Sequence, residues 1–81
     1  MNENSEMEAG TQPLDALMRA AELKNHDLVV ASSVGLTHKQ VAKARRGRRL
    51  TLRLQNRVLA AWNVARGEER KLEELFNYRG R

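Results

Sequence analysis

The chain has 81 residues, with 15 Lys or Arg against 10 Asp or Glu, so its formal net charge at neutral pH is +5. This length allows one domain with a single modest hydrophobic core. Trp62, Phe76 and Tyr78 are the only aromatic residues, which argues against a β-sandwich core and against a platform for stacking single-stranded bases. Because cysteine is absent, disulfides, cysteine-ligated zinc and thiol catalysis are excluded, and a reducing compartment is favoured.

The sequence also argues against contact with a membrane. No segment approaches the roughly 20 consecutive apolar residues that a membrane-spanning helix needs. The acidic N-terminal residues lack the basic and apolar regions of a signal peptide. We therefore expect a cytoplasmic protein.

The first predicted elements are a tail and a helix. Residues 1–12 are polar and acidic without a periodic apolar pattern, and we expect them to be a disordered tail ahead of a folded domain at residues 13–78. Pro13 suits the first turn of a helix. Apolar side chains then recur at spacings of three and four: Leu14, Leu17, Met18 and Ala21. This pattern predicts a first helix over residues 13–24.

Two short elements follow. Residues 28–33 are mostly apolar, and the pair Val29 and Val30 would also suit a strand. We predict a helix, because no partner strand can be found to satisfy the backbone of a lone strand. Thr37 is placed to cap a third helix over residues 38–46.

The remaining elements complete an all-α fold. Gly47 is expected to end the third helix, and Thr51 to cap a fourth over residues 52–64. A last short helix after Gly67 would carry three apolar residues: Leu72, Leu75 and Phe76. We expect these three either to close the core or to form the seam of a homodimer. The sequence thus predicts a compact bundle of about five short helices.

Charge is segregated along the chain. Residues 28–67, here called the basic block, contain nine Lys or Arg and no Asp or Glu, although acidic residues flank them on both sides. The basic members are Lys39, Lys43, Arg45, Arg46, Arg48, Arg49, Arg53, Arg57 and Arg66. Ordinary surfaces intersperse both signs, so the block favours a polyanion such as the phosphates of nucleic acid. The simpler interpretation is a solvated face whose positive charge is balanced by acidic residues nearby in space.

The apolar and glycine positions between residues 27 and 46 have a recognisable spacing: Val30, Ala31, Val34, Gly35, Leu36, Val41 and Ala44. A small residue at position 31 lets two helices cross closely, a glycine at 35 permits a left-handed turn, and the others are expected to fill the helix–helix contact. In this arrangement the chain, over residues 14–64, resembles the lambda-repressor-like helix-turn-helix domains. The resemblance implies that helix 38–46 enters the major groove of DNA.

The resemblance also implies which side chains would meet DNA. Six positions would face the groove: Thr37, His38, Lys39, Ala42, Lys43 and Arg46. The cations among them would donate to guanine O6 and N7, and the alanine would contact a thymine methyl. Four arginines look like contacts to phosphate, which position a protein without reading sequence: Arg48, Arg49, Arg53 and Arg57. The N-terminus of the helix that Thr51 caps would add backbone donors.

These features predict sequence-specific binding of double-stranded DNA by a small transcriptional regulator. The alternative is a protein-interaction module whose basic face docks an acidic partner. Structured RNA fits less well, because the narrow major groove of A-form RNA excludes a helix. His26 and His38 are the only histidines, and with no cysteine nearby we expect no metal site. We expect neither catalysis, nor a cofactor, nor a small-molecule substrate in so short a chain.

Overall fold

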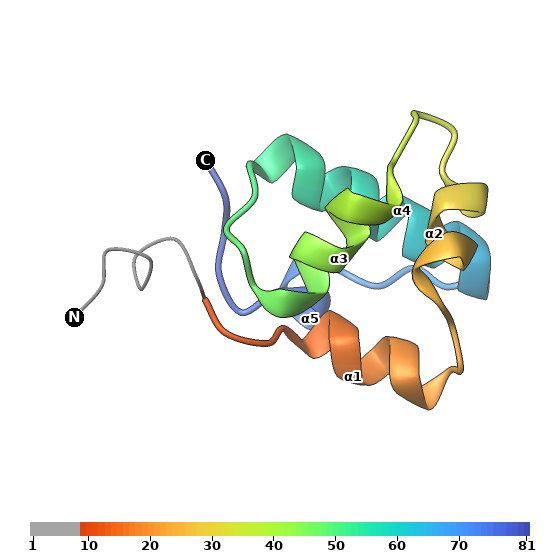
Figure 1. Ribbon diagram of the computed structural model, residues 1–81, viewed down its shortest axis with the longest axis horizontal. Coiled ribbons are helices and arrows are strands. Elements are labelled where there is room, and N and C mark those ends of the chain that lie inside the picture. The colour runs from red at the N-terminus through yellow and green to blue at the C-terminus, as the bar shows by residue number, and fades with distance from the viewer. Residues whose placement is uncertain (1–8) are drawn as a thin grey trace.

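The computed structural model describes residues 9–81, and these form five helices without a strand (Figure 1). The prediction of an all-α fold is confirmed. The helices are α1 (Pro13–Ala20), α2 (Asn25–Ala31), α3 (His38–Arg46), α4 (Leu52–Arg66) and α5 (Leu72–Leu75). Within the described residues, none of them combines the length and apolar character that would let it cross a membrane.

The helices enclose one aliphatic core around a single tryptophan. α2 packs against α3 and α4, while α1 packs against α3 and α5. The buried hydrophobic residues come from all five helices and from the loops between them: Leu14, Met18, Leu28, Leu36, Val41, Ala44, Leu50, Val58, Ala61, Trp62, Leu75 and Phe76. α3 lies on the near side of the bundle in Figure 1, so one of its faces covers the core while the other looks outward.

α1 is shorter than the sequence predicts. The helix buries Leu14 and Met18, one turn apart, but it ends at Ala20 rather than at residue 24. Glu22 adopts the left-handed conformation at φ +58°, and the Leu23 N–H donates to the Met18 carbonyl at 2.8 Å. A 6→1 hydrogen bond of this kind closes the helix while returning an apolar side chain to the core.

α2 begins earlier and ends earlier than predicted. The Asp27 carboxylate accepts the Lys24 N–H at 2.7 Å, and this local bond starts the helix at Asn25. At the other end the Ser32 hydroxyl accepts the N–H groups of Val34 (3.3 Å) and Leu36 (3.4 Å). A serine that bonds the backbone ahead of it competes with the next helical turn, so the chain leaves the helix after Ala31.

The connection between α2 and α3 corrects two predictions of packing. Residues 32–37 separate the helices, where a helix-turn-helix usually has about three or four residues. Val30 is 68% exposed and Val34 is 52% exposed, so neither fills the helix–helix contact expected of it. Val34 is exposed because α2 ends before it and the loop turns outward. Val30 is still within α2, two residues from the buried Leu28, and residues two apart lie on nearly opposite sides of a helix. Gly35 does adopt the expected left-handed conformation, at φ +79°.

α3 and α4 are bounded by the residues that the sequence indicates. The Thr37 hydroxyl accepts the Gln40 N–H at 3.1 Å, and the Gln40 side chain accepts the Thr37 N–H at 3.0 Å. Thr51 caps α4 in the same way, through the Leu54 N–H at 3.1 Å. Both helices end at a left-handed glycine, Gly47 (φ +93°) and Gly67 (φ +63°). α4 runs to Arg66, slightly beyond the predicted residue 64.

The described residues ahead of α1 are packed against the rest of the fold. Residues 1–8 of the expected disordered tail lie outside the described residues, whereas residues 9–12 pack on the body. The Ala9 N–H donates to the Gly47 carbonyl at 2.7 Å, and a Cβ at Gly47 would overlap the Gly10 carbonyl. Gln12 is buried and exchanges two hydrogen bonds with Asn77. The folded body therefore begins before Pro13.

The apolar residues of the last helix belong to the core. Leu75 and Phe76 are buried, and Leu72 is half-buried against the same cluster. α5 contacts α1 and α4. The interpretation of these residues as part of the core is confirmed, and a homodimer would need another surface.

Candidate nucleic-acid interface

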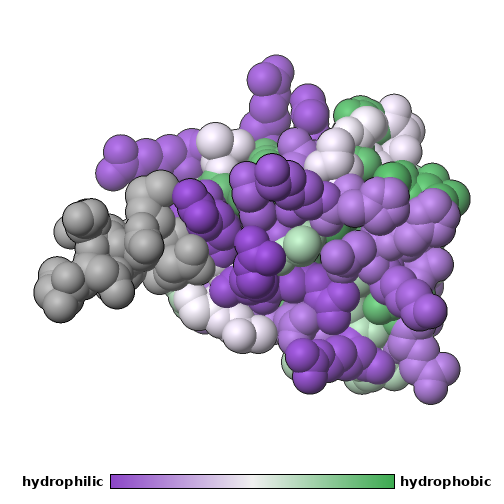
Figure 2. Space-filling model, in the orientation of Figure 1, coloured by the Kyte–Doolittle hydropathy of each residue, from purple (hydrophilic) through white to green (hydrophobic). Residues whose placement is uncertain are grey.

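The outward face of α3 is cationic. Lys39, Lys43 and Arg46 are separated by four and three residues, so they lie along one side of the helix. Val41 and Ala44, which are buried, occupy the opposite side. Ala42 lies beside the cations and is half-buried. The surface over α3 is almost entirely hydrophilic in Figure 2, and a helix about 10–12 Å across fits a major groove about 12 Å wide.

The N-terminal end of α3 is held by bonds within the chain. The Thr37 hydroxyl serves as the helix cap. His38 Nε2 lies 3.0 Å from His26 Nδ1, and the two rings are nearly parallel, at 9°. Sequence reasoning missed this pair, because helix periodicity does not bring residues 12 positions apart together. Thr37 and His38 are exposed, but their side chains are oriented before any ligand arrives.

Arg45 belongs to the basic block but not to its outward face. Its Nε donates to Asp15 Oδ1 at 2.7 Å, and its Nη1 donates to Asn25 Oδ1 at 2.8 Å. The two charged side chains are largely shielded from water, at 20% and 14% exposure. Arg45 therefore joins α3 to α1 and to the start of α2.

The basic loop after α3 gains two arginines from the C-terminal residues. The Leu52 N–H donates to the Arg81 carbonyl at 2.9 Å, which brings the end of the described chain alongside the start of α4. A hollow of about 590 Å³ is lined by Arg49, Arg79 and Arg81, together with Thr51. Sequence reasoning missed Arg79 and Arg81, because they follow the predicted domain and lie far along the chain from the basic block.

Tyr78 fixes this C-terminal segment. Its hydroxyl accepts the Leu50 N–H at 2.8 Å and donates to the Arg48 carbonyl at 3.3 Å. The Arg49 guanidinium carbon lies 5.0 Å from the centre of the tyrosine ring, at cation–π distance. Burial raises the pKa of Tyr78 above its ordinary value of 10.0. Arg48 and Arg49 are exposed, and their loop is thereby fastened to the C-terminal segment.

Two of the arginines of α4, Arg53 and Arg57, lie at a different hollow. Arg53 and Arg57 line a groove of about 220 Å³ between α4 and the α2–α3 loop. Val34 and Val64 line the same groove. These arginines thus share an edge with apolar surface, whereas Lys39, Lys43 and Arg46 lie on the outward side of α3.

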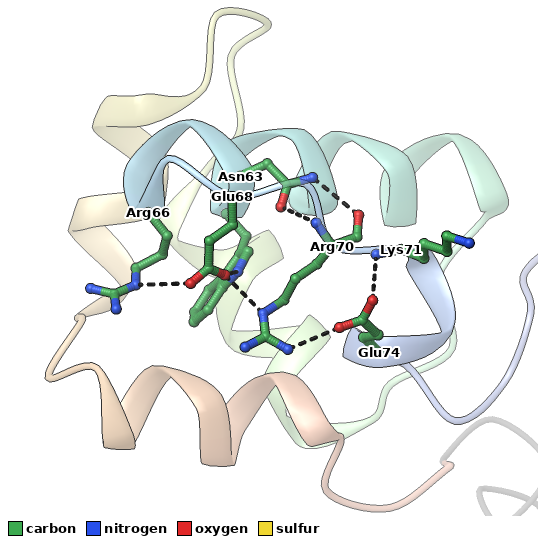
Figure 3. A network of polar contacts seen from close by, with 7 residues as sticks. Asn63, Arg66, Glu68, Arg70, Lys71 and Glu74 are labelled. Atoms are coloured by element: carbon green, nitrogen blue, oxygen red, sulfur yellow. Dashed lines mark hydrogen bonds and ion pairs between the residues drawn. The ribbon is translucent and has the colours of Figure 1, made fainter.

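Two of the acids that follow the basic block, Glu68 and Glu74, are engaged by their own neighbours (Figure 3). Glu68 Oε1 accepts Arg70 Nε–H at 2.8 Å and Trp62 Nε1–H at 2.9 Å. Arg70 Nη1 also donates to Glu74 at 3.0 Å. The hydrogen bonds from Arg70 and then Trp62 lower the pKa of Glu68 below its ordinary value of 4.5, and the bond to Glu68 raises the pKa of Arg70.

Among the residues that the structure describes, no ion pair balances the outward cations of α3. Within residues 9–81, the ion pairs join Asp15 to Arg19 and Arg45, and Glu68 and Glu74 to Arg66 and Arg70. None of these pairs includes Lys39, Lys43 or Arg46. Carboxylates among the described residues therefore balance part of the basic block, including Arg45 and Arg66, but form no ion pair with Lys39, Lys43 or Arg46.

The described residues contain no group of three or more His, Cys, Asp or Glu that could hold a metal ion. The comparisons with known proteins give no relative: no family model, curated protein or solved structure matches the chain. The argument for function therefore depends on the geometry and charge of the surfaces described above.

Proposed function

We propose that the protein binds double-stranded DNA sequence-specifically, as a small cytoplasmic transcriptional regulator of the lambda-repressor-like helix-turn-helix kind. The observation that carries the proposal is the division of α3 into two opposite sides. One side has Val41 and Ala44 in the core, and the other has three cations in a line. A helix anchored by so narrow an apolar stripe leaves most of its circumference available to a groove.

In this proposal the middle of α3 reads bases. Lys39, Lys43 or Arg46 donates to guanine O6 and N7, and Ala42 contacts a thymine methyl. Thr37 and His38 lie at the entry of the helix into the groove, where their hydrogen bonds within the chain hold them in place.

The phosphate contacts come from the loop and from α4. Arg48 and Arg49 follow α3 directly, and the N-terminus of α4 adds backbone N–H donors. Arg79 and Arg81 extend this cationic surface beside Arg49. Arg53 and Arg57 contribute to the positive potential from α4.

The proposal is tested by fluorescence anisotropy of a labelled random-sequence duplex of about 20 base pairs at several salt concentrations. Neutralising five or six phosphates makes log affinity fall by about 4 to 6 per decade of salt. Arg53→Ala, which removes a proposed phosphate contact, should reduce that slope by about one. Lys71→Ala removes an exposed cation beside the acidic α5 and should leave the slope unchanged.

A selection for preferred sites then separates reading of bases from attraction to phosphate. Lys43→Ala should relax the preference at one base position, because a bidentate contact contributes about 1–3 kcal/mol of discrimination. Failure of the protein to bind any duplex near 50 mM salt would contradict the proposal, since non-specific attraction is strongest at low salt.

A further inference from the structure

Apolar surface is exposed away from α3. Val30, Val34 and Val64 are the large hydrophobic residues that the structure leaves exposed among those it describes, at 68%, 52% and 68%. In Figure 2 hydrophobic residues gather at the upper right, over α2 and the loop that follows it. Two of the three valines, Val34 and Val64, line the groove of about 220 Å³ between that loop and α4.

Both walls of the groove are held in place by the fold. The Ser32 hydroxyl holds the loop through the N–H groups of Val34 and Leu36, and Leu36 is buried in the core. The opposite wall belongs to α4, where the side chains along the groove are small at Ala60 and Ala61. Small residues between two valines leave room for an incoming apolar side chain.

The dimensions favour part of a protein as the occupant. Small-molecule sites usually enclose about 300–1,000 Å³, and this groove is both smaller and open along α4. Exposed apolar surface with a polar rim is typical of protein–protein contact. Arg53 and Arg57 form that rim, one turn apart on α4.

The charge of the rim selects the kind of partner. Residues 28–67, which supply both walls, contain no carboxylate. A second copy docked symmetrically would set Arg53 and Arg57 against the same arginines, which is repulsive. A head-to-tail contact with a second copy would build a ring or an open filament rather than a symmetric dimer.

We propose that the groove between the α2–α3 loop and α4 docks an amphipathic helix of a different protein, whose apolar residues are flanked by Asp or Glu. The apolar side chains enter between Val34 and Val64, and the carboxylates pair with Arg53 and Arg57. The apolar part of this contact is separate from the proposed DNA-binding face, because neither valine belongs to the outward side of α3. Only Arg53 and Arg57 are shared between the two.

The experiment uses an amphipathic probe peptide of about 18 residues, long enough to be partly helical, with Leu at helical spacing and Glu between. A matched peptide has Lys in place of every Glu. Titration of ¹⁵N-labelled protein with the acidic peptide should shift the amides of Val34, Ala60 and Val64. The Lys peptide should leave them unmoved, because its charge repels the rim.

Two exposed neighbours on α4 give a matched pair of variants. Val64→Ser removes apolar surface from the groove. We expect it to weaken binding of the acidic peptide about fivefold to tenfold, as loss of one buried valine contact implies. Ala65→Ser lies outside the groove and should leave the affinity unchanged. Val34→Ser repeats the test from the opposite wall.

Other results would overturn the proposal. They are no binding of the acidic peptide, equal binding of both peptides, or shifts confined to residues outside the groove. Self-association in sedimentation that Val64→Ser abolishes would instead identify a second copy as the occupant. DNA affinity should be the same in wild type and Val64→Ser, so failure of this proposal is distinguishable from failure of DNA binding.

Discussion

The cations of α3 and the cation of the α4–α5 connection have opposite environments. Lys39, Lys43 and Arg46 face outward with no ion pair to a described carboxylate, whereas Arg70 lies between Glu68 and Glu74 in a hydrogen-bonded network. Arg45 belongs to the first group by sequence and to the second by structure. The comparison shows that a cation in the basic block is not always available to a ligand. The packing of the helices decides which cations are already paired with a carboxylate.

The largest expected effect tests this comparison at two neighbouring residues, Arg45 and Arg46. Arg45→Met keeps most of the apolar stem but removes the bonds to Asp15 and Asn25. We expect the free energy of unfolding to fall by about 2 kcal/mol in urea denaturation, as loss of largely shielded charged hydrogen bonds implies. Arg46→Met removes an exposed cation and should change the free energy of unfolding by less than about 0.5 kcal/mol.

The same two variants should reverse their order in DNA binding. Arg46→Met should lower affinity for a preferred site and relax its base preference, and Arg45→Met should do neither once it is folded. Equal effects of the two variants on both stability and affinity would show that α3 is not divided into a paired and an outward side.

A smaller effect concerns the hydroxyl that fastens the basic loop. Tyr78→Phe leaves the Leu50 N–H without its acceptor and should cost about 1 kcal/mol of stability at neutral pH. Because burial raises the pKa of Tyr78, the folded protein holds this proton more tightly than the unfolded chain. The contribution is complete below the ordinary pKa of 10.0 and is lost as pH rises through the folded value.

Urea midpoints measured between about pH 8 and about pH 11 check this alkaline prediction. Wild type should lose stability across the upper part of this range, and Tyr78→Phe should lose less. A parallel loss in the two proteins would assign the alkaline effect to other groups, such as the lysines.

The smallest expected effect concerns the paired acid Glu68 and the pH dependence of stability. The pKa of Glu68 is lowered by Arg70 and Trp62, so its contribution to stability is present above the ordinary pKa of 4.5 and is lost as pH falls through the folded value. Glu68→Gln should flatten the decline of thermal stability in this acidic range. Glu69→Gln, which changes an exposed neighbour, should reproduce the wild-type decline.

Much of the fold could be predicted because helix ends depend on local chemistry. Thr37 and Thr51 cap with hydroxyls three residues from their donors, and Gly47 and Gly67 accept left-handed conformations that other residues resist. The end of α2 was missed, because Ser32 could continue the helix or bond the backbone ahead of it, and the sequence does not decide between them.

The candidate site could be predicted only in part. The spacing of Lys39, Lys43 and Arg46 places them on one side of a helix, and the structure has that helix at the predicted residues. The inward turn of Arg45 depends on Asp15, which is 30 positions away along the chain. The arrival of Arg79 and Arg81 beside Arg49 depends on the packing of the C-terminal segment.

The sequence by itself determined that this chain is helical, where α3 begins and ends, and that residues 28–67 are free of acids. Those properties follow from spacing, capping and composition, which act within a few residues. The tertiary structure alone decided which cations are paired, that Val30 and Val34 are exposed, and that a groove forms beside α4. Ion pairs and burial join residues that are distant along the chain, so they exist only once the helices have packed.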